Sequence, residues 1–357
     1  MSSTSMSTPA ARPHRADAAT RGVRLTLPVH AAGSTAEIEL EPAHCERLFR
    51  AAAYVAIRDG DLRPGEEVFA QLVPGRTREQ HGPVRCLDSC AVELLAAGGR
   101  LVTRVEFPRA VFAAFAAARA VHLLVAAGQA VETLSIAYSL HALDAVEEPF
   151  PVEIPALRHR SIAALTRRAV AHGTPADDWV VTFVAPDVLA GLDAIERLSR
   201  ESGAEAAGRL HARVGFDRAR RRFVRILERL VISRATSATG TTVVSTAASW
   251  GDFLAASNGR GPRAFSHLHT HLHLSDTAAG DGVPGDHLLS ASPTLRAEGD
   301  PCVSIEDIVT HFTVFPDPLS AMLIVSLFPD RRVLKVYGYT PGAALREEPG
   351  YWVLPPT

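Results

Sequence analysis

Residues 264–273 read AFSHLHTHLH, and further along the chain residues 304–307 read SIED. In an extended strand every second side chain points to the same face, so the four histidines of the first stretch would share one face. Imidazole nitrogen and carboxylate oxygen suit Zn²⁺, and a catalytic zinc site takes three protein ligands and leaves a fourth position for water. Two of these histidines and Asp307 would supply three ligands. Taken alone, the first stretch also fits a polar strand face, and SIED also fits a helix cap.

The order of the segments along the chain favours a metal site over a polar strand face and a helix cap. An apolar run at 321–328 and a second strand-like segment at 333–339 follow SIED. His-x-His, then Ser-x-x-Asp, then a strand pair resembles the JAMM (Jab/MPN) zinc metallopeptidases, whose pattern is an upstream Glu, His-Ser/Thr-His and Ser-x-x-Asp. The family's histidines fall on His269 and His271, because only there does a hydroxyl residue, Thr270, stand between them.

The sequence departs from the family pattern in two places. Leu272 stands where the family usually has proline, and a polar, Gly/Pro-rich segment at 274–302 separates the two halves of the motif. Closing a longer loop costs only about 0.6 kcal/mol per doubling of its length, so such an insertion is compatible with the same ligands. A long loop without secondary structure is often functional, and we expect this one to cover the substrate groove.

The resemblance also implies the roles of the site residues. His269, His271 and Asp307 would be the zinc ligands, and Ser304 would donate a hydrogen bond to the developing oxyanion. The catalytic base would be Glu201, because glycines at 203 and 208 match the family's Glu-x-Gly-x-x-x-x-Gly. Glu205 is the alternative base, since the local sequence around Glu201 equally fits a solvated carboxylate at a helix end.

Two further histidines lie close to these positions. His311 follows Asp307 by one helical turn, so it either hydrogen-bonds the ligand carboxylate or occupies a core or surface position. His267 lies on the ligand face of the strand and replaces one of the two histidines if the register is shifted.

Composition excludes several classes of protein. The chain has 357 residues, 47% of them hydrophobic, and a formal net charge of −2, so it can bury a large core but has no overall basic field for nucleic acid. The longest apolar stretch, 110–127, is interrupted by Arg119 and His122, which argues against a membrane span. Four scattered cysteines fit a reducing cytoplasm. Cys86-x-x-x-Cys90 with His81 resembles half a zinc site but lacks a second ligand pair.

Hydrophobic periodicity and turn residues divide the chain into four parts. We expect an α+β protein with a disordered tail at 1–22, a smaller α+β N-terminal domain at 23–150, a JAMM/MPN domain at 151–345 and a C-terminal tail at 346–357. The resemblance gives the third part a cytidine-deaminase-like α/β fold with a mixed sheet. The expected helices are 42–57, 110–126, 162–172, one from 186 or 187, a short one after Ser249 and one from Ser304. The expected strands are 23–29, 36–40, 67–73, 101–107, 131–143, 179–185, 209–214, 222–232, 241–246, 264–273, 321–328 and 333–339.

Together these features predict a function. The resemblance implies a cytoplasmic, zinc-dependent isopeptidase that cleaves a ubiquitin-like protein or its conjugates, in a bacterial, deubiquitinase-like form. The N-terminal domain would help to recognise a substrate or partner. Two alternatives remain, a metal-free MPN scaffold that only binds proteins and a small-molecule amidase on the same fold.

Overall fold

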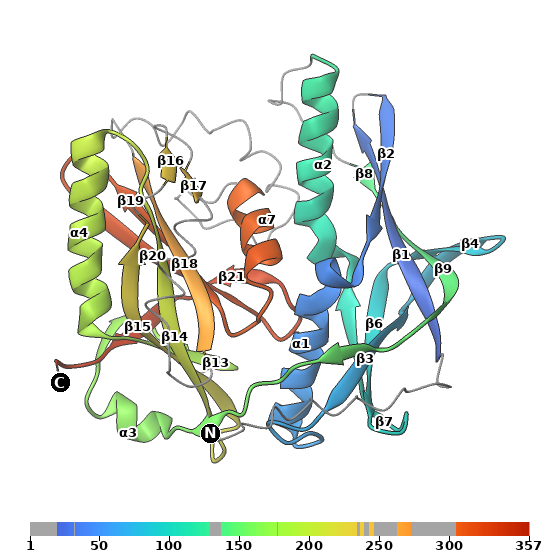
Figure 1. Ribbon diagram of the computed structural model, residues 1–357, viewed down its shortest axis with the longest axis horizontal. Coiled ribbons are helices and arrows are strands. Elements are labelled where there is room, and N and C mark those ends of the chain that lie inside the picture. Colours follow the sequence, from blue (N-terminus) through green and yellow to red (C-terminus); the bar gives the residue numbers. More distant parts are fainter. Residues whose placement is uncertain are drawn as a thin grey trace, which may run out of the picture.

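The N-terminal region, residues 20–152, forms two antiparallel sheets that pack with two helices (Figure 1). In the computed structural model the described residues are 20–31, 33–128, 137–176, 178–233, 236–238, 243–245, 263–272 and 305–356. One sheet has the order β2-β1-β9-β5-β4, with β8 pairing β1, and the other has the order β10-β3-β6-β7. The elements are β1 Thr20–Ala31, β2 Ser34–Leu40, α1 Pro42–Asp59, β3 Val68–Pro74, β4 Thr77–His81, β5 Val84–Leu87, β6 Ser89–Ala96, β7 Leu101–Pro108, η1 Arg109–Phe112, α2 Ala113–Ala126, β8 Ala137–Tyr138, β9 Leu140–Glu147 and β10 Phe150–Val152.

Helix α1 shows how local sequence sets these elements. Pro42 occupies its first turn, where the missing N–H is not needed. The helix ends at Gly60, whose φ of 87° lies in the left-handed region that glycine adopts without steric cost. Its apolar face is buried and includes Leu48, Phe49 and Tyr54. The expected helix at 42–57 is therefore present with nearly the same bounds.

The C-terminal region, residues 158–356, is built on a curled, mixed sheet of ten strands (Figure 1). Its order is β12-β22-β13-β15-β14-β18-β19-β20-β21, with β11 pairing β14. Helix α4 packs on β15 and β18, whereas α7 lies on the other side of the sheet, next to α1 and α2. The elements are β11 Arg158–His159, α3 Ile162–Thr166, β12 Val170–Gly173, β13 Val180–Val184, α4 Pro186–Ser202, β14 Ala207–Asp217, β15 Arg222–Ile232, β16 Thr236–Ala238, β17 Val243–Ser245, β18 Arg263–Leu272, α7 Ile305–Val314, β19 Ala321–Leu327, β20 Arg332–Tyr339, β21 Leu345–Glu347 and β22 Gly350–Val353.

Several boundaries differ from those expected. The predicted tail at 346–357 is wrong for most of its length, because β21 and β22 belong to the large sheet and β22 pairs with both β12 and β13. The predicted helix at 162–172 stops at Thr166, and the chain then forms strand β12 at the sheet edge. Strand β1 already begins at Thr20, within the predicted tail at 1–22. The rest of that tail, the helix after Ser249 and the whole 274–302 insertion, including its expected role as a cover over the substrate groove, lie outside the described residues, as does the first part of the expected strand at 131–143.

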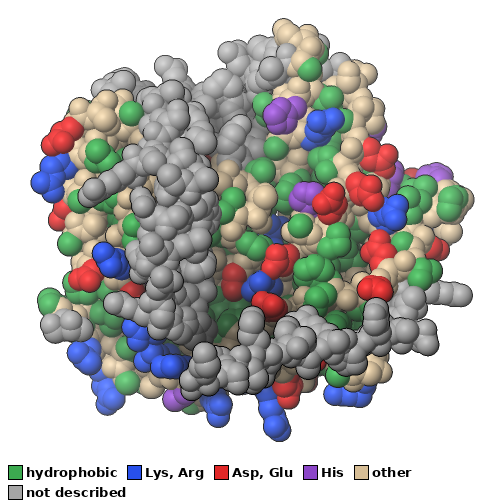
Figure 2. Space-filling model, in the orientation of Figure 1, with side chains coloured by type: hydrophobic (Ala, Val, Ile, Leu, Met, Phe, Trp, Pro, Cys, Tyr) green, Lys and Arg blue, Asp and Glu red, His purple; other side chains and the backbone are tan. Residues whose placement is uncertain are grey.

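The two regions share one core. A single cluster of buried hydrophobic side chains includes residues of α1 and α2 together with residues of β14, β18, β19 and α7. The described part of the chain contains no helix with both the length and the apolar character required to cross a membrane. On the face in Figure 2, basic side chains gather along the lower edge, and acidic side chains are mixed with hydrophobic ones over the N-terminal region. Both signs of charge are thus exposed on this face.

Candidate metal centre

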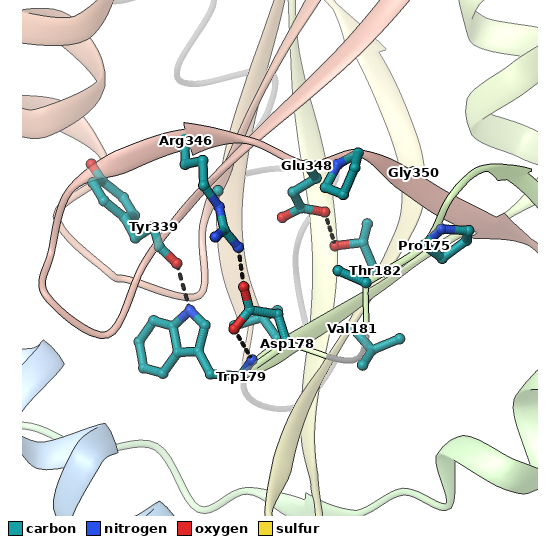
Figure 3. Close-up of a pocket in the computed structure, with 13 residues that line it drawn as sticks. Pro175, Asp178, Trp179, Val181, Thr182, Tyr339, Arg346, Glu348 and Gly350 are labelled. Carbon is teal, nitrogen blue, oxygen red and sulfur yellow. Dashed lines mark hydrogen bonds and ion pairs between the residues drawn. The ribbon is translucent and has the colours of Figure 1, made fainter. Parts of the chain in front are cut away.

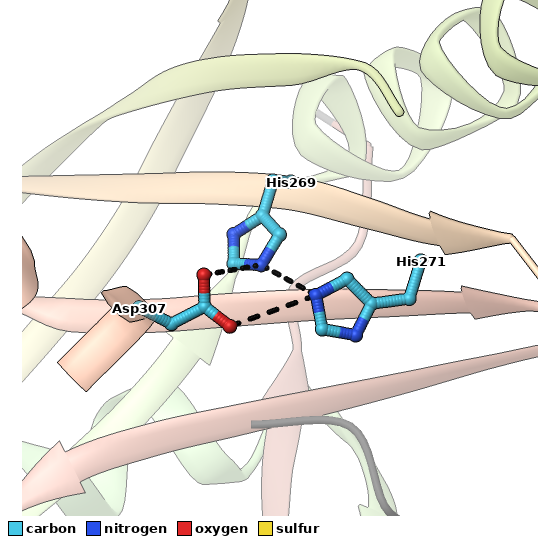
Figure 4. Close-up of side chains that lie close together, drawn as sticks. All are labelled: His269, His271 and Asp307. Carbon is cyan, nitrogen blue, oxygen red and sulfur yellow. Dashed lines mark hydrogen bonds and ion pairs between the residues drawn. The ribbon is translucent and has the colours of Figure 1, made fainter. Parts of the chain in front are cut away.

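Strand β18 and helix α7 bring three potential metal ligands together (Figure 4). Strand β18 lies between β14 and β19, and its alternation places His269 and His271 on one face. Asp307 projects toward them from the first turn of α7. The side chain of His269 is 5% exposed, whereas those of His271 and Asp307 are 16% and 18% exposed. The three side chains are therefore largely buried, but those of His271 and Asp307 remain partly accessible to solvent.

The spacing of the donor atoms suits a metal ion. The His269 and His271 Nε2 atoms are 2.8 Å apart, and the Asp307 oxygens lie 3.2 Å from His269 Nε2 and 3.6 Å from His271 Nε2. A tetrahedral ion with ligands at about 2.0–2.1 Å holds its donors about 3.3 Å apart, which is within this range. These three residues form the one such group found among the described residues, and they can bind a metal ion.

The electrostatics of His269 also favour a cation. Burial lowers its pKa, but the charge of Asp307, the hydrogen bond to Asp307 and the charge of Glu205 raise it. Burial is the largest single cause, but the other three together outweigh it, so the pKa of His269 lies above its ordinary value. A group that holds a proton more tightly than usual lies in a negative potential, which stabilises any cation at the same place.

Glu205 completes the site. Helix α4 ends at Gly203, whose φ is 65°, and the chain then turns into β14. The residue after Glu205, Ala206, pairs through its backbone with Thr270, which lies between the two histidines. Glu205 is only 9% exposed, and burial, the largest influence, raises its pKa to about 7; Asp307 adds to the rise and His269 opposes it. The carboxyl group is thus influenced by the charges of two of the three ligands.

The other base candidate, Glu201, occupies a different place. It lies in the last turn of α4 and is exposed. The structure brings Glu205 to the metal group and leaves Glu201 at the surface of the helix. Ser304, the expected oxyanion donor, and His273 lie outside the described residues.

A second pair of histidines packs behind the ligands. The His267 ring stacks on the His269 ring, with centroids 5.4 Å apart, and its Nδ1 lies 3.3 Å from His311 Nδ1. Burial is the main cause that lowers the pKa of both rings, to about 3 for His267; nearby cationic groups add to the fall, and the charge of Asp307 opposes it at His267. A lowered pKa favours the neutral form of both rings, and in that form one Nδ1 can donate its N–H to the other. The sequence left open a hydrogen bond from His311 to Asp307 or a core or surface position. The structure places His311 in the core, and its Nδ1 contacts His267.

Two other features do not add to this site. A small pocket lies between β13 and the β20–β22 segment, at the end of the sheet where β13 begins (Figure 3). Its polar side chains are paired with one another, Asp178 with Arg346 and Thr182 with Glu348. The possible half zinc site also fails to assemble among the described residues, because Cys90 is buried in β6 and His81 pairs with Glu79.

Helix α7, which carries Asp307, is held by the N-terminal region. The guanidinium carbon of Arg47 lies 3.6 Å from the centroid of the Phe312 ring, and the Phe115 ring is 6.2 Å from the same ring. Just after the helix, Asp317 accepts a hydrogen bond of 3.1 Å from Tyr54 and forms an ion pair of 3.5 Å with Arg50. Contacts from α1 and α2 therefore fix the position of the third ligand relative to the two histidines.

Replacing Phe312 with alanine should weaken metal binding as well as the fold. Loss of this 6% exposed ring is expected to lower the free energy of unfolding by about 3–5 kcal/mol. Because α7 loses its anchor on α1, the affinity for zinc should also fall by about 10-fold. Denaturant unfolding and titration against a chromophoric chelator measure the two effects. Phe183→Ala is the matched control, because Phe183 is also buried, at 0% exposed, but belongs to a separate cluster formed by β13, β15 and α3. Equal losses of zinc affinity in both variants would contradict a specific role of α7 packing.

Comparison of the chain with models of known protein families and with curated proteins gives no match.

Proposed function

We propose that this protein is a zinc-dependent isopeptidase that cleaves a ubiquitin-like protein or its conjugates, on a fold of the JAMM/MPN type. The observation that carries the proposal is a group of three donors with a buried carboxyl close enough to sense their charges. His269, His271 and Asp307 offer donor atoms at metal-binding distances, and the charges of His269 and Asp307 act on the buried Glu205. Their chain order, glutamate, His-x-His and aspartate, is the order of the JAMM pattern that the sequence resembles.

Two imidazoles and one carboxylate form a donor set that suits Zn²⁺ and leaves one tetrahedral position for water. When bound, zinc supplies a Lewis acid for the scissile carbonyl and lowers the pKa of a water molecule to about 7. His269 and His271 orient this site from a strand inside the large sheet, where His269 pairs with both β14 and β19 and His271 pairs with β19. Asp307 contributes the negative charge that makes the site attractive to a cation.

Glu205 is the base in this proposal. Amide hydrolysis requires a group that removes a proton from water and later gives one to the leaving amine. A carboxyl with a pKa of about 7 performs both transfers near neutral pH. Ser304 precedes α7 and is proposed as the donor to the oxyanion; a donor of this kind contributes about 100-fold to 1,000-fold in rate. The N-terminal region, which contacts the helix that carries Asp307, is proposed to contribute to recognition of the protein substrate or a partner.

The proposal is tested on the purified full chain. We expect about one zinc per chain by mass spectrometry, since one group of three potential zinc ligands is found in the described part of the chain. Activity is then measured on ubiquitin and on bacterial ubiquitin-like proteins carrying a fluorogenic amide at their C-terminus, on an isopeptide-linked conjugate and on small acyl amides. Cleavage of the protein substrates alone supports the isopeptidase. Cleavage of small amides alone identifies an amidase, and protein binding without metal identifies a scaffold.

A further inference from the structure

Two buried hydroxyl groups bracket Glu205. Thr270 and Ser199 are both 0% exposed, and their oxygens lie 2.9 Å apart. The amide N–H of Ala206 donates to Thr270 Oγ1 over 2.8 Å, and Ser199 Oγ donates to the carbonyl oxygen of Ala204 over 2.7 Å. The residues before and after Glu205 are thus each tied to one of the two hydroxyls.

The available protons and the shorter distances give a direction to the bonds in this set. The carbonyl of Ala204 can only accept, so the Ser199 proton is used there. The Thr270 hydroxyl has two acceptors, Ser199 Oγ at 2.9 Å and the carbonyl of Ala206 at 3.4 Å, and we take the shorter bond to Ser199. Thr270 Oγ1 in turn accepts from the amide of Ala206. The result is a one-way chain, Ala206 N–H to Thr270 O–H to Ser199 O–H to Ala204 C=O. Each hydroxyl donates once and accepts from one neighbour, and the chain closes a ring through the backbone of Glu205.

We propose that Thr270 and Ser199 are positioning residues that hold the Glu205 carboxyl against the metal ligands; the proposal rests on the role of Glu205 as the base. Thr270 stands between His269 and His271, so its side chain points to the opposite face of β18 from theirs. A second bond, from the amide of Thr270 to the carbonyl of Ala206 at 2.9 Å, joins the same two segments. The ring therefore couples three elements, the ligand strand, the end of α4 and the segment that carries the base.

This arrangement explains why a hydroxyl is needed between the two histidines. Valine has nearly the shape of threonine but can neither accept from Ala206 nor donate to Ser199. Serine keeps both functions and loses only a methyl group. Catalysis depends on the base lying within hydrogen-bond reach of the reacting water, and small displacements of such a group reduce the rate steeply.

The test compares Thr270→Val and Thr270→Ser in the full chain. We expect Thr270→Val to keep its zinc, to lower kcat by about 10-fold to 100-fold and to change KM by less than about threefold, since the ligands stay in place. Thr270→Ser should recover most of the loss. Deuterium exchange at the amide of Ala206 should be at least about 10-fold faster in Thr270→Val, because its acceptor is gone. Ser199→Ala opens the ring at its other end and should lower kcat in the same way, which provides a second variant if Thr270→Val does not fold.

Thr182→Val is the matched control, since it removes a hydrogen-bonded hydroxyl that is 3% exposed from the same sheet, beside Glu348 and away from the ligands. It should lower the melting temperature without the change in kcat. Wild-type kcat in Thr270→Val, or a loss of zinc parallel to the loss of activity, overturns the positioning role. If the wild-type protein cleaves none of the substrates, the proposed function fails, and exchange at Ala206 decides the ring by itself. An unchanged rate there would overturn it.

Discussion

Replacing His269 with alanine is expected to remove both the bound metal and all hydrolysis. His269 is the most buried of the three ligands and the one whose Nε2 lies close to both of the others, at 2.8 Å from His271 and 3.2 Å from Asp307. Without it, one imidazole and one carboxylate remain, and two protein ligands do not form a stable zinc site. We expect zinc content to fall from about one per chain to near zero, and kcat/KM to fall below detection. Mass spectrometry of the metal and the peptidase assay measure both.

The control for this prediction is an exposed histidine of the same region. His172 lies on the edge strand β12 and stacks on Tyr351, so His172→Ala should keep both zinc and activity. The His269→Ala, His271→Ala double variant tests the register of the strand. Full zinc in that variant would mean that the ligands are other histidines of the same strand, with His267 the first candidate. We instead expect the double variant to bind no zinc, because the His267 and His311 pair behind the site should not hold the ion by itself.

Much of the metal group can be predicted from the sequence, because it depends on local periodicity. The alternation in residues 264–272 places His269 and His271 on one face of a strand, and Asp307 follows a capping-type serine into a helix. Both elements are present where the pattern puts them. The histidines and Asp307 are far apart in sequence. The sheet brings them together, because β18 pairs in parallel with β19, the strand that follows α7.

Local periodicity could not decide whether Glu201 or Glu205 is the candidate base. Both glutamates lie close to a glycine, and the motif with glycines at 203 and 208 favours Glu201. The structure places Gly203 at the end of α4, so Glu201 remains on the helix surface while Glu205 lies in the connection just before β14. What brings Glu205 to the histidines is the pairing of Ala206 with Thr270, a contact between distant parts of the chain. The sequence feature that could have indicated this contact is the hydroxyl residue Thr270 between the two histidines.

Dependence on distant partners also explains why two strands at one end of the large sheet were not predicted. Residues 350–353 lie between prolines and look like an extended tail, and 170–173 continue a helical pattern. In the structure these two short segments pair with each other, and β22 also reaches β13. Neither is stable as a strand without its partner, so nothing in either segment alone predicts it.

Glu205→Gln is expected to keep the metal and to lose hydrolysis. Glutamine has the same shape as glutamate, so the ring of bonds around its backbone should persist. The amide cannot take a proton from water, and loss of a general base typically lowers the rate by about 100-fold to 10,000-fold. We expect kcat to fall by this amount, with zinc content and KM close to those of the wild-type protein. Steady-state kinetics together with metal analysis measure each quantity, and the inactive variant should retain uncleaved substrate.

Glu201→Gln is the control for the Glu205→Gln prediction. The two glutamates lie one helical turn apart in sequence, yet Glu201 is exposed and Glu205 is buried beside His269 and Asp307. Removing the charge of Glu201 should therefore leave kcat within about twofold, because a solvated carboxylate at a helix end makes little contribution to a distant site. If activity were instead lost in Glu201→Gln and retained in Glu205→Gln, the base would lie on α4, and the helix end would have to reach the metal group in the active protein. A fall in both variants to the same degree would indicate that neither carboxyl transfers the proton alone.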